Sequence, residues 1–314
     1  MQIVKYIGYI FLTLLLFVLL SYFYLQDYLK TTLKNPKIVY IPKGSTKSVY
    51  DYFVKKGYGL NPIDYYLIKY QGYPQAGWID VKEENLSRWD FFYKITHSRA
   101  MGVKITIFPG ETTEIILEQL AKKYDLNVTK LHTFYKQFAP YPEGVIIPET
   151  YTYYKGIDEK KLIKVLIFSS LKKHKLLSKK MLGYYKEDEW FKKYITIASI
   201  IQKESANKKE MPKISAVIYN RLKKGMKLQM DGTLNYGKNS HKKVTPKQIR
   251  DDNSSFNTYK IKGLPPYPVC IVEKSAIYAA VKPDKNDYLY FVKKDKNSHY
   301  FSKTYKEHLK NIKK

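Results

Sequence analysis

Cysteine is almost absent from this chain of 314 residues, because Cys270 is the only one. A lone cysteine cannot form an internal disulfide, so the sequence neither requires nor forbids an oxidising compartment. Its neighbours Val269 and Ile271 favour a small buried hydrophobic residue over a reactive nucleophile. The six histidines show no pair four residues apart and no cluster with cysteine at zinc-like spacing. We therefore expect no metal site and no other cofactor.

Acidic residues are scarce, since 28 Asp and Glu stand against 56 Lys and Arg, giving a formal net charge of +28. Such a chain is attracted to polyanions, whether nucleic acid, anionic lipid or an acidic cell wall. The positive charge is spread along the chain and comes mainly from Lys, whereas base recognition favours the planar guanidinium of Arg. Without an Arg-rich arm or a recognised motif, nucleic acid is not a predicted partner.

Charged residues are also missing from residues 6–25, which are rich in Leu, Phe, Ile and Val. Twenty residues in a helix span about 30 Å, the thickness of the bilayer hydrocarbon. No A-x-A-like tripeptide follows this run, so an uncleaved anchor is a better interpretation than a signal peptide. The sequence predicts a single transmembrane helix at residues 6–25.

The orientation of this helix is not settled by its flanking charges. Lys5 precedes it, and Lys30, Lys34 and Lys37 follow it. By itself, the positive-inside rule places the following domain in the cytoplasm. Long soluble domains often cross the membrane regardless of such counts, so the charges leave both orientations open.

Two segments, 41–54 and 107–120, share a pattern of strand, Pro/Gly turn and helix. In each, a Ser or Thr follows the turn, where it can cap the helix. This pattern indicates small α+β modules, with a boundary near residues 100–106. The aromatic residues between the two segments could stack on sugars, but in so small a domain Trp78, Trp89 and Phe92 are expected in the core.

A helix over residues 196–205 carries an unusual carboxylate. Its apolar stripe is Ile197, Ile200 and Ile201, and Glu204 falls on the same stripe seven residues after the first. Two interpretations follow. The side chain could end the stripe and point to water, which is the commoner case near a helix end. It could instead be a partly desolvated acid with a raised pKa, able to donate a proton near neutral pH.

Three polar and aromatic stretches follow, at residues 228–237, 256–259 and 263–268. Loops of this kind on a helical scaffold are typical walls of a binding site, although each alone is also ordinary turn chemistry. Arg221, on the helix before them, could form an ion pair or be solvated. Residues 288–301 read as a β-hairpin.

These pieces, in this order, resemble the endolytic murein transglycosylase family, also called the YceG-like family. Nearly the whole chain takes part, and the resemblance is densest between Ile197 and His308. It implies that Glu204 is the catalytic residue. Gln202 stands where many members have a second Glu, which concentrates the expected chemistry on Glu204. The matching segments are 142–151, 198–205, 220–222, 228–231, 257–259, 263–266 and 290–308, and the implied substrate-binding residues are Ser205, Gln229, Asp231, Asn257 and Tyr259.

The resemblance also implies the fold class and the organisation of the chain. We expect an α+β protein with a cytoplasmic N-terminus at 1–5, the anchor at 6–25 and a LysM-like glycan-binding region at 38–105. Residues 106–314 would form a mixed α/β catalytic domain with the catalytic Glu on a helix. The protein would cross the inner (cytoplasmic) membrane once, with this domain outside the cytoplasm. The implied partners are peptidoglycan glycan strands, that membrane and the peptidoglycan synthases.

The implied reaction is lytic cleavage of nascent glycan strands, which terminates or trims them. The acid protonates the oxygen between MurNAc and GlcNAc, and its carboxylate then takes the proton of the MurNAc 6-hydroxyl, leaving a 1,6-anhydroMurNAc end. One carboxylate suffices because the nucleophile belongs to the substrate, whereas ordinary glycosidases need two. Two alternatives stay open: a muramidase-type hydrolase that uses Glu204 with Asp231, and a non-catalytic, membrane-anchored peptidoglycan-binding scaffold.

Overall fold

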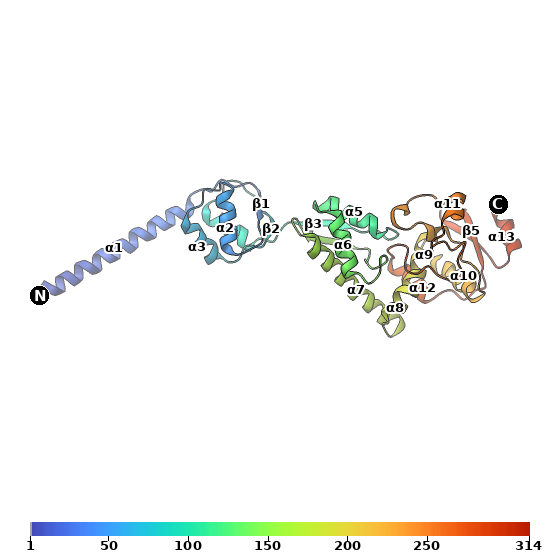
Figure 1. The fold of residues 1–314 in the computed structure, drawn as a ribbon. Helices are drawn as coiled ribbons and strands as arrows, with labels where there is room; N and C mark the ends of the chain where they lie inside the picture. The colour runs from blue at the N-terminus through green and yellow to red at the C-terminus, as the bar shows by residue number, and fades with distance from the viewer. Residues whose placement is uncertain (1) are drawn as a thin grey trace. The chain divides into compact units, whose positions relative to one another are not determined.

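The computed structural model describes residues 2–314, with side chains from Lys5 onward, and is drawn in Figure 1. The chain divides into two compact units. Unit 1 consists of Met1–Val103 with Tyr153–Ile157, and unit 2 consists of Lys104–Thr152 with Asp158–Lys314. Helices and small two-stranded sheets are mixed in the chain, which confirms the α+β class.

The long helix α1, Gln2–Lys30, is the first element of unit 1. Its portion Lys5–Lys30 is the one helix among the described residues that is long and apolar enough to cross a membrane. Side chains from Lys5 to Asp27 are exposed, whereas Tyr28 is buried against the rest of the unit. The helix is therefore compatible with a single-pass anchor whose last turn belongs to the folded unit.

The rest of unit 1 is built on a small antiparallel sheet and three helices. Strand β1, Ile38–Ile41, pairs with β2, Gly77–Asp80. The helices are α2 (Thr46–Lys55), α3 (Pro62–Gln71) and α4 (Arg88–His97). The expected cap of α2 is present, since the side chain of Ser45 accepts a hydrogen bond from the backbone of Ser48. The core is apolar and rich in phenylalanine, with Phe53, Ile68, Ile79, Phe91, Phe92 and Ile95 fully buried.

One aromatic side chain of this unit differs from the expectation. Phe92 is fully buried as predicted, but Trp89 is 39% exposed. Helix α4 buries Arg88, Phe91, Phe92 and Ile95, which recur at the spacing of one helical face. Trp89 follows Arg88 by one residue and so lies off that face. The prediction that Trp89 is a core residue was wrong.

Strands β3, Gly102–Thr106, and β4, Thr150–Tyr154, form a second two-stranded sheet, and the chain passes between the two units within both strands. Unit 2 then contains the helices α5 (Thr113–Tyr124), α6 (Val128–Phe138), α7 (Glu159–Leu182), α8 (Glu187–Glu189), α9 (Thr196–Glu204), α10 (Met211–Lys223), α11 (Pro246–Asp251), α12 (Lys274–Val281) and α13 (Tyr305–Ile312). It also has the π-helical turn η1 (Trp190–Ile195) and the 3-10 turns η2 (Asp231–Leu234) and η3 (Gly237–Asn239).

The C-terminal hairpin of unit 2 is the one expected from the sequence. Strand β5, Tyr290–Asp295, pairs antiparallel with β6, Ser298–Ser302, and places Phe291 opposite Phe301. Helix α13 follows and packs on both strands. Its first turn is closed by a capping box between Thr304 and Glu307.

Helix α9 is held rigidly in the core of unit 2. Ile197, Ile200 and Ile201 are fully buried, and the helix packs against α10 and α12. The hydroxyl of Ser199 accepts a hydrogen bond of 3.0 Å from the backbone N–H of Val269. Cys270, the residue after Val269, is fully buried, as expected for a small hydrophobic residue. This packing fixes the end of the helix, where Glu204 lies.

Candidate active site

Glu204 is the last residue of α9, and its side chain lines a pocket of unit 2. The pocket has a volume of about 370 Å³, in the range of small-molecule sites. Its walls come from α10, the loop before η2, the segment around residue 259, the hairpin and α13. The lining residues are Glu204, Arg221, Leu228, Gln229, Asp231, Tyr259, Tyr290, Phe291, Val292, Tyr305 and His308.

The Glu204 carboxylate is held by the backbone at the start of η2. The N–H of Gly232 donates a hydrogen bond of 2.6 Å to Oε1 of Glu204. A Cβ atom on residue 232 would lie 2.8 Å from that oxygen and 2.5 Å from Cβ of Lys203, closer than atoms can approach. Only glycine therefore lets the chain come this near to the carboxylate.

The surroundings of Glu204 favour its neutral form. Burial raises the pKa of Glu204 to about 7, because a carboxylate in a desolvated site loses the stabilisation of water. The Gly232 N–H and the positive charge of Arg221 act in the opposite direction, and the negative charge of Asp231 adds to the increase. A carboxyl group with this pKa is divided about evenly between acid and base near pH 7.

Arg221 ties together the segments that form the pocket walls. Its Nε donates a hydrogen bond of 2.6 Å to the carbonyl of Leu289, and its Nη1 donates one of 2.5 Å to the carbonyl of Leu228. The guanidinium also lies 5.2 Å from the ring centroid of Tyr290. Of the two interpretations left open for Arg221, neither is correct, because the side chain is buried and bound to carbonyl groups.

The loop that precedes Gly232 has an unusual conformation. Gln229 has φ of +50°, in the left-handed region that few non-glycine residues adopt. The Gln229 N–H donates to the carbonyl of Thr258, and the Met230 N–H donates to the Thr258 hydroxyl. Thr258 is fully buried, so two hydrogen bonds to it hold the loop in this shape. The side chain of Gln229 is thereby directed to the pocket that it lines.

Asp231 and Tyr259 form a hydrogen-bonded pair at the same pocket. The Tyr259 hydroxyl donates a hydrogen bond of 2.6 Å to Oδ1 of Asp231. Burial and this bond to a carboxylate raise the pKa of Tyr259 well above its usual range, so the phenol keeps its proton at any physiological pH. Asp231 is an exposed residue, which leaves its other oxygen accessible to a ligand.

Residues 39–314 match the YceG-like family. The chain belongs to this family. Among curated proteins it resembles the endolytic murein transglycosylase of Bacillus subtilis strain 168, with 36% identity over 209 residues, which are 63% of this chain and 54% of that protein. The endolytic murein transglycosylase of Streptococcus pneumoniae strain D39 is 30% identical over 180 residues, or 54% of this chain and 31% of that protein. The chain thus spans about half, or less, of the length of these relatives.

A solved structure gives the same assignment. The crystal structure of a YceG-like protein from Listeria monocytogenes aligns with a TM-score of 0.57 at 28% sequence identity. The alignment covers 87% of this chain and 97% of that one. The fold of this YceG-like chain is therefore shared with a member of its family over most of its length.

Two of the site residues expected from the sequence lie outside the pocket lining of this YceG-like chain. Asn257 is fully buried, and its amide donates hydrogen bonds of 2.8 and 2.7 Å to the carbonyls of Ile249 and Asp252. It thereby shapes the segment that carries Tyr259. The Ser205 hydroxyl is buried and has no hydrogen-bond partner among the described residues. A direct contact of either residue with substrate stays a prediction.

Seven residues of the YceG-like pocket were missed as site residues by the sequence reasoning, and those with polar or charged groups are Arg221, Tyr290, Tyr305 and His308. The last three come together because α13 packs on the hairpin, where the ring of His308 stacks on Tyr290 with centroids 5.2 Å apart. The sequence did contain a signal, since the segment 290–308 carries part of the family resemblance. Alternation along a strand does not tell which face meets a pocket.

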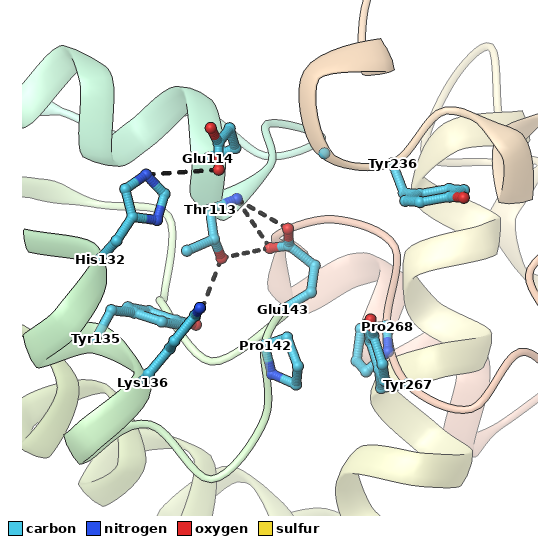
Figure 2. Close-up of a pocket in the computed structure, with 11 residues that line it drawn as sticks. Thr113, Glu114, His132, Tyr135, Lys136, Pro142, Glu143, Tyr236, Tyr267 and Pro268 are labelled. Atoms are coloured by element: carbon cyan, nitrogen blue, oxygen red, sulfur yellow. Dashed lines mark hydrogen bonds and ion pairs between the residues drawn. The ribbon is translucent and has the colours of Figure 1, made fainter. Parts of the chain in front are cut away.

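A second buried carboxylate, Glu143, lines a smaller pocket of about 210 Å³ (Figure 2). Its oxygens accept hydrogen bonds from the N–H and hydroxyl of Thr113, at 2.9 and 2.7 Å, and from the N–H of Gly144. Burial raises the pKa of Glu143 to about 7. Three donors occupy this carboxylate and close the first turn of α5, so Glu143 acts as a helix cap. The sequence predicted a Ser or Thr as this cap, but the hydroxyl of Thr112, which directly precedes α5, donates to the carbonyl of Gly237.

Proposed function

We propose that this protein is an endolytic peptidoglycan lytic transglycosylase with Glu204 as its general acid and then its base. The observation that carries the proposal is the position of Glu204, whose pKa is raised to about 7 by burial at the base of a polar pocket. Two curated relatives named endolytic murein transglycosylase support the reaction type. Glu143 has a similar pKa, but its oxygens are occupied by backbone and hydroxyl donors.

In the first step, neutral Glu204 donates its proton to the glycosidic oxygen between MurNAc and GlcNAc, and the bond from that oxygen to the anomeric carbon of MurNAc breaks. Oε1 already accepts from Gly232, so Oε2 is the oxygen that would carry the proton. The resulting carboxylate is stabilised by the Gly232 N–H, which favours the charged form.

In the second step, the carboxylate removes the proton from the 6-hydroxyl of the same MurNAc, whose oxygen attacks the anomeric carbon. The product is a 1,6-anhydroMurNAc end, and Glu204 is again neutral. No water takes part, and intramolecular attack has a large entropic advantage over attack by an external nucleophile. A pKa near the working pH suits a group that acts first as acid and then as base.

The other residues of the pocket would bind and orient the sugars. Asp231 presents an accessible carboxylate oxygen that can accept a sugar hydroxyl or face the positive charge that develops at the anomeric carbon. Tyr259 fixes the orientation of Asp231 through their hydrogen bond. Gln229 offers an amide at the pocket wall. Arg221 would act as a positioning residue, since it joins the loop at Leu228 to the hairpin.

The same proposal includes the location of the protein. Helix α1 would cross the cytoplasmic membrane once and place the following units outside the cytoplasm, where glycan strands are made. Residues 38–105 would bind glycan as a LysM-like region, as the family resemblance implies. Cleavage near the synthases would terminate or trim nascent strands.

The proposal is tested by digesting purified peptidoglycan with the full-length protein in detergent, beside Glu204→Gln. Mass spectrometry of the fragments should show anhydro ends from the wild type and none from the variant. Glu118→Gln, at an exposed position of α5, serves as a matched control and should cleave like the wild type. Cleavage by a folded Glu204→Gln protein at the wild-type rate would disprove the role of this residue.

A muramidase-type hydrolase is the second candidate, because Asp231 lies in the same pocket as Glu204 and could activate a water molecule. Reducing ends in the digest would favour this reaction, and Asp231→Asn should then abolish it. A non-catalytic scaffold would bind peptidoglycan without releasing fragments, and Glu204→Gln would leave its cellular effect unchanged.

A further inference from the structure

Four aromatic side chains stand exposed on neighbouring helices of unit 1. Tyr66 and Tyr70 lie on α3, and Trp89 and Tyr93 lie on α4. Tyr70 is the most exposed of them, at 80%, and Trp89 is 39% exposed. Monomeric soluble proteins rarely leave a group of large rings uncovered, so the group calls for a partner. We refer to these four residues as the aromatic surface.

The four rings belong to one continuous face. The two residues of each pair are four positions apart, so they lie one turn above the other on the same side of their helix. Helices α3 and α4 pack against each other, and the ring centroids of Tyr70 and Trp89 are 6.4 Å apart. The amide of Gln71 donates a hydrogen bond of 3.2 Å to the carbonyl of Trp89. The aromatic surface therefore has a fixed shape.

This surface lies beside the end of α1. Trp89 lines a shallow hollow together with Gln26, Leu29 and Lys30, which belong to the last turns of that helix. In Figure 1, α3 lies toward the end of unit 1 that α1 enters. The exposed rings are thus next to the point at which the apolar helix meets the folded unit.

The junction between α1 and the rest of unit 1 is firm. Arg88 lies over the ring of Tyr28 at 4.6 Å from its centroid, and its Nε donates a hydrogen bond of 2.9 Å to the Thr31 hydroxyl. The Arg88 N–H donates to the carbonyl of Thr31, and the Leu33 N–H donates to the carbonyl of Leu86. A helix held in this way cannot swing freely, so the aromatic surface keeps one orientation relative to α1.

Tyrosine and tryptophan are the side chains that prefer the interface between lipid and water, where the ring is in contact with lipid and the polar group is hydrated. We propose that the aromatic surface rests in the headgroup layer of the same bilayer that α1 crosses, so that unit 1 lies on the membrane. This inference relies on the proposed anchor. Lys30 and Lys69, on α1 and α3, are exposed and attract anionic headgroups, and they outnumber the exposed Asp90 beside Trp89, which repels them.

Exposed aromatic rings can also stack on sugars, but the geometry of this surface favours lipid. A sugar site collects polar side chains around a cleft. Here the rings spread over the outer sides of two helices, and the nearby hollow is walled by the end of α1. A planar layer of headgroups fits such a surface better than a single ring does.

The test uses spin labels on the full-length protein in vesicles of phosphatidylethanolamine and phosphatidylglycerol. Single cysteines are introduced as Tyr70→Cys and Trp89→Cys on the aromatic surface, Leu14→Cys within α1, and Arg99→Cys as a matched exposed control. Arg99 lies just beyond α4, whose ten residues rise about 15 Å from its start. The wild-type chain controls for background labelling, since Cys270 is fully buried.

We expect the label at position 14 to collide with oxygen, which dissolves in lipid, more than with a water-soluble nickel chelate, and the label at position 99 to show the reverse. Labels at positions 70 and 89, in the headgroup layer, should have a ratio of oxygen to nickel collisions between these two. If the label at position 14 lies in lipid but those at positions 70 and 89 collide with nickel as often as the label at position 99, α1 is an anchor and the proposed membrane contact of the aromatic surface is wrong. If the label at position 14 also lies in water, α1 is not an anchor, and the proposed contact is wrong as well. Protection of 70 and 89 by purified glycan, but not by vesicles, would assign the surface to sugar and overturn the inference.

Discussion

The close approach of Gly232 to Glu204 leads to a specific prediction for Gly232→Ala. The new methyl group would meet Oε1 of Glu204 at 2.8 Å and Cβ of Lys203 at 2.5 Å, so the loop has to withdraw. Withdrawal breaks the 2.6 Å hydrogen bond from the Gly232 N–H to the carboxylate. A hydrogen bond to a charged group contributes about 1.5–3 kcal/mol. Since about 1.4 kcal/mol corresponds to one pKa unit, the pKa of Glu204 should rise by about 1–2 units.

The pH dependence of cleavage measures this shift. In the proposed reaction Glu204 is protonated at the start, so kcat/KM of the wild type should fall as the pH rises above about 7. In Gly232→Ala this decline should move to higher pH, while the maximal rate drops because the carboxylate formed in the first step loses its donor. The assay is the release of anhydro-ended fragments at a series of pH values.

The control for this experiment is Gly225→Asn. Gly225 follows α10 with φ of +65°, where a Cβ atom meets nothing within 4 Å and asparagine is tolerated. This variant perturbs a glycine of unit 2 without touching the carboxylate, and its pH profile should match the wild type. The reasoning is refuted if Gly232→Ala folds, cleaves and shows the wild-type pH profile.

Three further variants test two other residues of the site and the second buried carboxylate. Asp231→Asn removes a negative charge that raises the pKa of Glu204, so the decline of kcat/KM should move to lower pH, opposite to Gly232→Ala. In Arg221→Lys, the single amino group of the lysine cannot reach the carbonyls of both Leu228 and Leu289. The loss of one such hydrogen bond, about 1.4 kcal/mol, should lower kcat/KM about tenfold. The far-UV circular dichroism spectrum should stay unchanged. Glu143→Ala removes the cap of α5 and should lower the free energy of unfolding in urea by about 1–3 kcal/mol. The pH profile of Glu143→Ala should match that of the wild type. If kcat/KM of this variant no longer falls at high pH, Glu143 and not Glu204 supplies the acid.

Local patterns in the sequence predicted the parts of the structure that depend on neighbours along the chain. The stripe of Ile197, Ile200 and Ile201 placed Glu204 at the end of a buried helix face, and the three isoleucines are indeed fully buried. The hairpin was found for the same reason, since alternation and a short polar turn lie within one segment.

The contacts that complete the site join residues far apart in the sequence. Arg221 binds the carbonyl of Leu289, which lies 68 positions later, and no local pattern records this pairing. Glu143 caps a helix that begins 30 positions before it. The sequence suggested a Ser or Thr for this task, because such a residue before a helix is a common cap, but a buried carboxylate provides more acceptor oxygens.

The π-helical turn at Trp190–Ile195 has a consequence for how the chain tolerates changes in length. A π turn holds one residue more than an α turn, and here the hydroxyl of Thr196 donates to the carbonyl of Phe191, which helps to satisfy the widened backbone. Loss of one residue from this turn could be absorbed by its return to α-helix, leaving α9 in register. Loss of one residue inside α9 would instead rotate Glu204 by about 100° and turn it away from the pocket. The turn can therefore take up a change of one residue in length before α9 begins.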